Sequence, residues 1–296
     1  MEAAAAGAAA LLALSSGALG QPSFVSRVDP ATLRGEGAAL RLPSWAFGVA
    51  WARRGSTVAL VVKPTGGTGF PIRILSTSPL RVVRSISVGA RDVCGLTFRG
   101  PTLVALVSDR LCYRTGGSFA VLRLDVRRGR VVSAVAVPGL HVAYPTNVAF
   151  GDGRAFVARA GGGVDVVSLA TGATAARVPR RVLAKGADIV PAHWLGRHRL
   201  ALAARVVDVR TWRSRVLEPG ARGVVAAGGD LVAYGPRGVA VYTRGGRPLF
   251  RPVTAGAVWN VETFGRYVYA GSTVVDVRTR RVSTGSPAAA TLVLSY

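Results

Sequence analysis

Short apolar segments alternate with small polar turns along most of this chain. Residues 161–178, GGGVDVVSLATGATAARV, show the pattern, with two apolar segments on either side of a turn that contains Thr171 and Gly172. Apolar runs of about four to eight residues, bounded by Gly, Asp, Ser or Thr, are typical of β-hairpins. A single hairpin cannot bury its own apolar side chains. The pattern therefore indicates that the hairpin packs against further copies of the same unit.

The hairpin recurs seven times. One residue near the turn marks each copy: Asp29, Ser76, Asp125, Ser168, Asp208, Tyr242 and Asp276. The steps between these positions are 47, 49, 43, 40, 34 and 34 residues, close to the length of one four-stranded propeller blade. Further strand pairs lie between the copies, for example residues 258–264 and 266–271. The spacing predicts an all-β fold, a β-propeller of seven four-stranded blades; six blades with irregular ends is the alternative.

The two ends of the chain complete the predicted ring. Residues 24–42 form the first hairpin, and residues 290–296, ATLVLSY, form an isolated last strand. We expect the N- and C-terminal strands to share a blade. Opening such a ring would expose apolar faces and unpaired strand edges, so the shared blade would hold it closed.

Residues 1–20, MEAAAAGAAALLALSSGALG, are small and apolar and end in the small-x-small sequence Ala18-Leu19-Gly20. This pattern is typical of an export signal, although Glu2 occupies a place where such signals carry Lys or Arg, which suggests an upstream start. We expect an export signal over 1–20, a single propeller domain over 21–296, and a secreted or cell-envelope location. A disordered Ala-rich leader is the alternative.

The hairpins with the pattern V-D-x-x-T-x-x-V, as in VVDVRTRRV at residues 274–282, resemble the YVTN and quinoprotein-like propeller repeats of exported bacterial proteins. The resemblance spans nearly all of residues 21–296. The Trp-Asp dipeptide of WD40 blades is absent, and the hairpin around Tyr242 lacks both the Asp and the Thr. Proteins with these repeats include lactonases, cofactor-dependent dehydrogenases and binding proteins, so the resemblance implies the fold and leaves the function open.

The chain is strongly basic, with 38 Lys and Arg against 14 Asp and Glu and a net charge of +24. Only Lys63 and Lys185 are lysines. A GC-rich coding sequence explains arginine in place of lysine, but it does not explain the shortage of acids. The charge therefore points to an anionic partner or surface.

Arginines recur at the outer hairpin turns, which emerge on one side of a propeller. We expect them to form a basic crown that binds phosphate-rich polymers or an anionic membrane surface. The alternative is a solvated rim that shields strand edges. The predicted binding residues are Arg127, Arg128, Arg130, Arg180, Arg181, Arg210, Arg213, Arg278, Arg280 and Arg281. Arg81, Arg84, Arg177, Arg215, Arg244 and Arg247 belong to the same series.

A second candidate surface is the funnel, where loops enter the innermost strands and ligands bind in concave sites. The residues placed there by register are Arg91, Asp92, His141, Tyr144, Asn147, Asp188, Trp259, Asn260 and Glu262. They form no recognisable catalytic set. Solvated loop residues are the alternative.

Cys94 and Cys112 are the only cysteines, and register places them at neighbouring ends of one inner hairpin. We expect a disulfide, with two buried thiols as the alternative. His193 and His198, in HWLGRH, match no zinc signature, so we interpret them as surface or packing residues. The sequence predicts no metal and no cofactor.

These observations favour an exported, non-catalytic binding or scaffold propeller at the cell envelope, monomeric, with an unknown protein or an anionic envelope polymer as its partner. A peripheral membrane surface is a further candidate partner. Nucleic acid is disfavoured because aromatic residues are not interleaved with the arginine turns. The alternative is an enzyme, a lactone hydrolase or a quinone-dependent oxidoreductase, with its site in the funnel.

Overall fold

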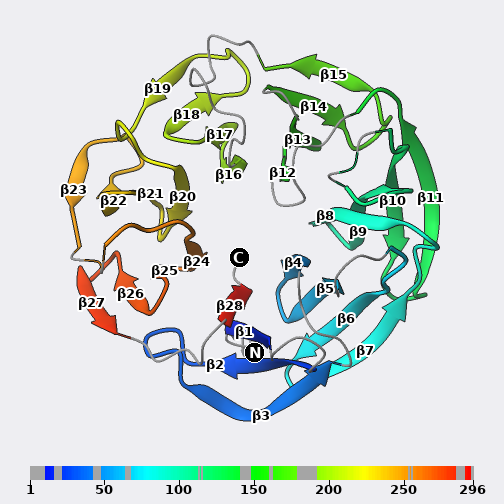
Figure 1. Ribbon diagram of the computed structural model, residues 1–296, viewed down its shortest axis with the longest axis horizontal. Helices are drawn as coiled ribbons and strands as arrows, with labels where there is room; N and C mark the ends of the chain where they lie inside the picture. The colour runs from blue at the N-terminus through cyan, green and yellow to red at the C-terminus, as the bar shows by residue number, and fades with distance from the viewer. Residues whose placement is uncertain are drawn as a thin grey trace, which may run out of the picture.

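Seven four-stranded antiparallel sheets form a ring, which confirms the predicted seven-bladed β-propeller (Figure 1). The computed structural model describes residues 11–16, 22–42, 48–63, 68–112, 114, 116–140, 148–159, 163–178, 192–252, 254, 256–284 and 291–294. Within these ranges there is no helix long and apolar enough to cross a bilayer.

Six blades are continuous in sequence. Blade 1 contains β4 (Gly48–Arg54), β5 (Thr57–Lys63), β6 (Ile72–Thr77) and β7 (Leu80–Ile86); blade 2 contains β8 (Asp92–Arg99), β9 (Thr102–Ser108), β10 (Phe119–Asp125) and β11 (Arg130–Val137); blade 3 contains β12 (Val148–Gly151), β13 (Arg154–Ala158), β14 (Val164–Ser168) and β15 (Thr174–Arg177). Blade 4 contains β16 (Ala192–Gly196), β17 (Arg199–Leu202), β18 (Arg205–Asp208) and β19 (Ser214–Val216); blade 5 contains β20 (Gly223–Ala227), β21 (Asp230–Gly235), β22 (Gly238–Tyr242) and β23 (Pro248–Phe250); blade 6 contains β24 (Glu262–Phe264), β25 (Tyr267–Ala270), β26 (Thr273–Asp276) and β27 (Arg281–Thr284).

The seventh, closing blade combines both ends of the chain. Its strand order is β28 (Thr291–Leu294), β1 (Leu11–Ser16), β2 (Ser23–Val28) and β3 (Gly35–Leu42), as expected for a shared blade. Its second strand, β1, comes from the segment predicted as an export signal. Leu11 and Leu12 are fully buried there, so cleavage after residue 20 would remove an internal strand. Export itself stays a prediction.

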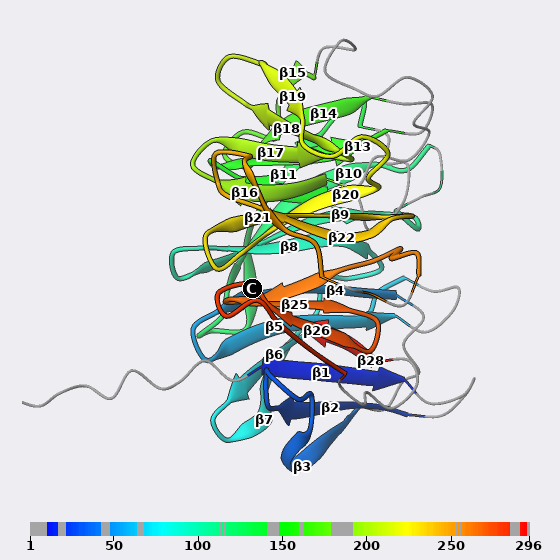
Figure 2. The same ribbon diagram turned by 90° about the vertical axis from the view of Figure 1, so that its left-hand side faces the viewer.

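The strands run between the two faces of the disc (Figure 2). In blades 1–6 the first strand is innermost, so all innermost strands begin at one face, which we name the funnel face. Connections between the first and second strands, and between the third and fourth, lie on the opposite face. We name that face the turn face.

Burial falls from the centre of the ring to its rim. In β5 six of the seven residues are buried, whereas buried or half-buried positions alternate with exposed ones in the outer strand β11. The inner strands are covered on both faces by the neighbouring blades. Val61 and Ile74 of blade 1, for example, share one apolar cluster with Leu103 and Leu122 of blade 2.

The hairpin turns are fixed by their acids, as predicted. The carboxylate of Asp208 accepts hydrogen bonds from the backbone N–H groups of Arg210 (2.9 Å) and Thr211 (3.0 Å), and Asp29, Asp125 and Asp276 cap their own turns in the same way. These bonds replace the backbone partners that a tight turn lacks. The repeated Asp and Ser positions therefore mark turns and are not free ligands.

Candidate functional site

Eight of the ten predicted crown residues lie within the described chain, and all eight are exposed. They are Arg127, Arg128, Arg130, Arg210, Arg213, Arg278, Arg280 and Arg281. They lie at the turns between the third and fourth strands of blades 2, 4 and 6, on the turn face. Arg180 and Arg181 lie outside the described residues.

Blade 3 interrupts this series. Its outer turn, residues 169–173, contains no arginine. Arg177 does not lie at that turn: it ends β15 on the funnel face, where its Nε is 3.3 Å from the buried carboxylate of Asp165. The sequence series placed Arg177 with the crown because the residue follows the hairpin by only a few positions, and that placement was wrong.

Some turn-face arginines hold neighbouring blades together. Arg199 Nη1 donates to the carbonyl oxygen of Arg244 at 2.7 Å, and Arg215 Nη1 donates to that of Gly245, both from blade 4 to blade 5. The guanidinium of Arg280 lies 5.9 Å from the ring centroid of Phe250. Contacts of this kind are structural.

Other turn-face arginines make no such contacts. Within the described chain, the side chains of Arg127, Arg210, Arg213 and Arg278 are exposed and form no hydrogen bond or ion pair. We name these four the free turn arginines. Their charges are available to a partner.

An open groove of about 720 Å³ lies on the turn face between blades 3 and 4. Asp152, Arg154, His198, Arg210 and Trp212 contribute to its lining, and His198 Nδ1 pairs with the carboxylate of Asp152. Asp152, His198 and Trp212 have φ angles of 48°, 61° and 55°. Positive φ is unfavourable for a bulky side chain, and blade 3 has glycine at the position equivalent to Trp212. The turn of blade 4 therefore places the indole of Trp212 at the groove although its positive φ angle is unfavourable.

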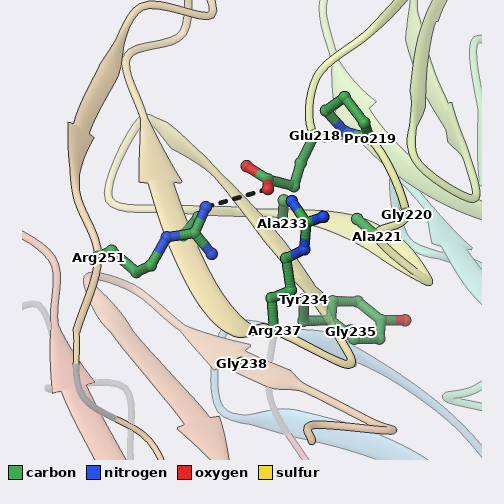
Figure 3. Close-up of a pocket in the computed structure, with 11 residues that line it drawn as sticks. Glu218, Pro219, Gly220, Ala221, Ala233, Tyr234, Gly235, Arg237, Gly238 and Arg251 are labelled. Atoms are coloured by element: carbon green, nitrogen blue, oxygen red, sulfur yellow. Dashed lines mark hydrogen bonds and ion pairs between the residues drawn. The ribbon is translucent and has the colours of Figure 1, made fainter.

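A buried carboxylate lies between blades 4 and 5 (Figure 3). Glu218 accepts hydrogen bonds from the hydroxyl of Tyr242 and from Arg251 Nη2, the latter at 3.0 Å. Burial alone would raise the pKa of Glu218. The hydrogen bonds from Tyr242 and Arg251 lower the pKa by more than burial raises it, so the pKa of Glu218 is below its usual value. The adjacent cavity of about 10 Å³ holds one water at most. This cluster stabilises the blade interface and leaves no space for a larger ligand.

On the funnel face, the predicted ligand residue Asp92 has a structural role. Its carboxylate lies 2.7 Å from Lys63 Nζ and accepts a hydrogen bond from the backbone N–H of Cys112 at 2.9 Å. Cys112 is bonded to Cys94, with their Cα atoms 5.5 Å apart, which confirms the predicted disulfide. Asp92 thus fixes the loop that carries the disulfide.

Of the other predicted funnel residues, Arg91 is exposed at the start of β8. His141, Tyr144, Asn147 and Asp188 lie outside the described residues. Trp259, Asn260 and Glu262 lie just before or at the start of the innermost strand β24, as the register predicts. Trp259 is 61% exposed, the most exposed large aromatic residue described.

The structure joins Glu262 to residues that the sequence did not identify as a site. His193 Nε2 of blade 4 lies 3.2 Å from the hydroxyl of Tyr234 of blade 5, and that phenol lies close enough to Glu262 of blade 6 for the carboxyl group to affect its titration. Arg222 stacks over Trp259, 5.3 Å from the ring centroid. We name His193, Tyr234, Asn260 and Glu262 the funnel cluster.

Gly223 explains how Tyr234 reaches this position. A Cβ atom at Gly223 would lie 2.4 Å from the hydroxyl oxygen of Tyr234. The phenol therefore occupies the space of a missing side chain at the start of the innermost strand β20. Any other residue at position 223 would displace it.

Burial sets the protonation states of the funnel cluster. It lowers the pKa of His193 to about 4 and raises the pKa of Glu262 to about 8, which a hydrogen bond from Asn260 lowers in part. Burial, with a smaller contribution from Glu262, raises the pKa of Tyr234 to about 12. These shifts favour the neutral forms of the imidazole, carboxyl and phenol groups near pH 7.

The ring of seven blades defines the class of protein, a seven-bladed β-propeller. No protein-family model and no curated protein sequence matches the chain. It is similar in structure to the WD40 propeller domain of Doa1 (12% identity, TM-score 0.53, 93% of this chain and 89% of that chain) and to hydrazine synthase from Kuenenia stuttgartiensis (13%, 0.54, 94% and 95%). A chain of the mitotic checkpoint complex is also similar (12%, 0.57, 90% and 84%). At these identities the similarity shows the fold alone.

Proposed function

We propose that the protein is a non-catalytic binding module at the cell envelope and that its turn face binds an anionic partner. The observation that carries the proposal is the set of free turn arginines, which project from blades 2, 4 and 6 on one face and form no ion pair within the described chain. Near an anionic lipid surface each such charge contributes about 1 kcal/mol of attraction. Four together give useful affinity without a deep pocket.

The alternative, a rim of charges that shields strand edges, accounts for only part of the crown. It fits Arg215 and Arg280, which contact the neighbouring blade. It does not account for the free turn arginines, because they lie on turns and not along an exposed strand edge.

Two further features support the proposal. The groove beside Trp212 offers an apolar surface next to Arg154 and Arg210, a combination suited to an acidic protein segment. The disulfide between Cys94 and Cys112 fits an oxidising compartment, in agreement with the expected export.

An enzyme with its site in the funnel is less well supported. Asp92, one of the few acids placed there, is held by Lys63 in a buried ion pair. Burial raises the pKa of Glu262 to about 8, which favours the protonated carboxyl group near pH 7 and makes it poorly suited to act as a nucleophile.

The test compares two variants with the same net charge. The turn-face variant replaces Arg127, Arg210, Arg213 and Arg278 by Gln. The control variant replaces four exposed arginines of the funnel face by Gln: Arg91, Arg110, Arg114 and Arg237. Binding to anionic vesicles, neutral vesicles and an anionic wall polymer is measured by co-sedimentation at low and high salt.

We expect the wild type and the control variant to bind the anionic targets at low salt and to release them at high salt. Neither should bind neutral vesicles. The turn-face variant should lose this binding. Preference for vesicles or for polymer identifies the source of the anionic groups. Equal losses in both variants would show that net charge alone is responsible and would overturn the proposal.

A further inference from the structure

The funnel cluster lies on the face opposite the free turn arginines and differs from them in chemistry. His193, Tyr234 and Glu262 come from three successive blades and meet at the innermost strands, where the ring narrows to its centre. His193 and Glu262 are 69 positions apart in the sequence. The packing of three consecutive blades brings these side chains together.

The cluster is built to hold a tyrosine hydroxyl in one place. The missing side chain at Gly223 admits the phenol, and His193 Nε2 lies 3.2 Å from its oxygen. The two rings contact edge to face, with centroids 6.4 Å apart. Core packing alone would not require a hydroxyl at this point, since a phenylalanine would fill the same space.

The edge of the cluster carries an exposed aromatic surface. Trp259 is 61% exposed although Arg222 stacks over it, and Asn260 beside it is also exposed. The indole of Trp259 therefore offers an accessible apolar ring beside polar groups of the funnel cluster. Asn260 connects this aromatic surface to Glu262 by a hydrogen bond.

We propose that the funnel cluster and Trp259 form a binding site for a neutral saccharide. The apolar face of a sugar ring packs on the indole, and its hydroxyl groups exchange hydrogen bonds with the imidazole, amide and carboxyl groups, while the buried phenol of Tyr234 positions the imidazole. A neutral ligand fits because the cluster presents hydrogen-bond donors and acceptors that match sugar hydroxyl groups, and burial favours their uncharged forms, so neither partner loses the solvation of an ion on binding. Arg222 disfavours a cationic ligand.

The test uses an array of neutral oligosaccharides with and without added carboxylate or sulfate groups. We expect the wild type to retain at least one neutral saccharide. Trp259→Ala should weaken that binding about tenfold or more through loss of the stacking surface. Phe24→Ala, which removes an exposed aromatic residue from β2, is the matched control and should change nothing.

Two further variants test the geometry. Gly223→Ala displaces the Tyr234 hydroxyl without altering any contacting group and should weaken binding as much as Tyr234→Phe. Glu262→Gln keeps a neutral donor and acceptor and should change the affinity by no more than about threefold. Thermal unfolding confirms that each variant is folded.

Retention of no neutral saccharide by the wild type would overturn the proposal, as would retention of charged saccharides only. Loss of binding in Glu262→Gln would show that an ionised carboxylate is needed and would contradict the neutral site. The turn-face variant should bind the saccharide normally. Failure of this inference is therefore separate from failure of the proposed function.

Discussion

Removal of residues 1–20 should open the ring. The strand β1 pairs with β28 on one side and with β2 on the other, with Leu14 opposite both Leu292 and Val25. Without β1 these two strands face each other across the width of a missing strand. The closing blade could then hold the ring together only by shifting β28 outward and leaving the centre open.

The cost follows from burial. Leu11 and Leu12 are fully buried and Leu14 is 2% exposed. Each buried leucine contributes about 1.5–3 kcal/mol, so the three contribute roughly 5–9 kcal/mol before any backbone hydrogen bond is considered. A domain of ordinary stability has only about 5–15 kcal/mol in total. The truncated chain should therefore be unfolded or close to it at 37 °C.

The assay is thermal and denaturant unfolding of three chains: the full chain, the chain without residues 1–10, and the chain without residues 1–20. The shorter deletion is the matched control because it leaves β1 intact. Leu12→Ala in the full chain should cost about 2–5 kcal/mol. A chain without residues 1–20 that unfolds at the same temperature as the full chain would refute β1 as part of the closing blade and would fit an export signal removed after residue 20.

Three other perturbations should have defined effects. Gly172→Ala should destabilise the fold by at least about 2 kcal/mol in denaturant unfolding, because φ is 69° and the added Cβ would lie 2.3 Å from a backbone oxygen. Gly220→Ala is the control: its φ is 79° but no atom lies close to the added Cβ. It has the conformational cost alone and should therefore lose less stability. Reducing the bond between Cys94 and Cys112, which are 18 residues apart, should cost roughly 3 kcal/mol; an unchanged denaturation midpoint in reductant would contradict this. The lowered pKa of Glu218 means that its contribution to stability is present above its unfolded pKa and is lost as the pH falls below about 4. The difference in Tm between wild type and Glu218→Gln should accordingly shrink in acid, and a difference independent of pH would argue against an ionised Glu218.

The blade count could be predicted from the sequence because hairpins are local. An acid such as Asp208 caps the turn that follows it. In the strands before and after that turn, successive side chains point alternately toward one neighbouring blade and the other. Both signals lie within one short segment. The disulfide could be predicted for the same reason, since Cys94 and Cys112 belong to one inner hairpin and its following loop.

The role of residues 11–16 could not be predicted in this way. A run of Leu and Ala is expected in an export signal and equally in a strand buried on both faces. Only the partner strands β2 and β28 distinguish the two, and β28 lies at the opposite end of the chain.

The funnel cluster was missed for a related reason. His193 does not belong to a recognisable sequence motif. Tyr234 occupies a strand position at which an ordinary core residue is expected. Gly223 was the available signal, because glycine at the start of an innermost strand leaves space for a side chain from elsewhere. The sequence does not specify which side chain fills that space.

We propose that the position of the arginines on the turn face, and not the net charge, directs binding to an anionic partner. The most direct measurement is the affinity for anionic vesicles of the turn-face variant and of the control variant, which differ only in where four arginines are removed. We predict at least about thirtyfold weaker binding by the turn-face variant, equivalent to roughly half of the attraction expected from four charges. Equal affinities would contradict the account.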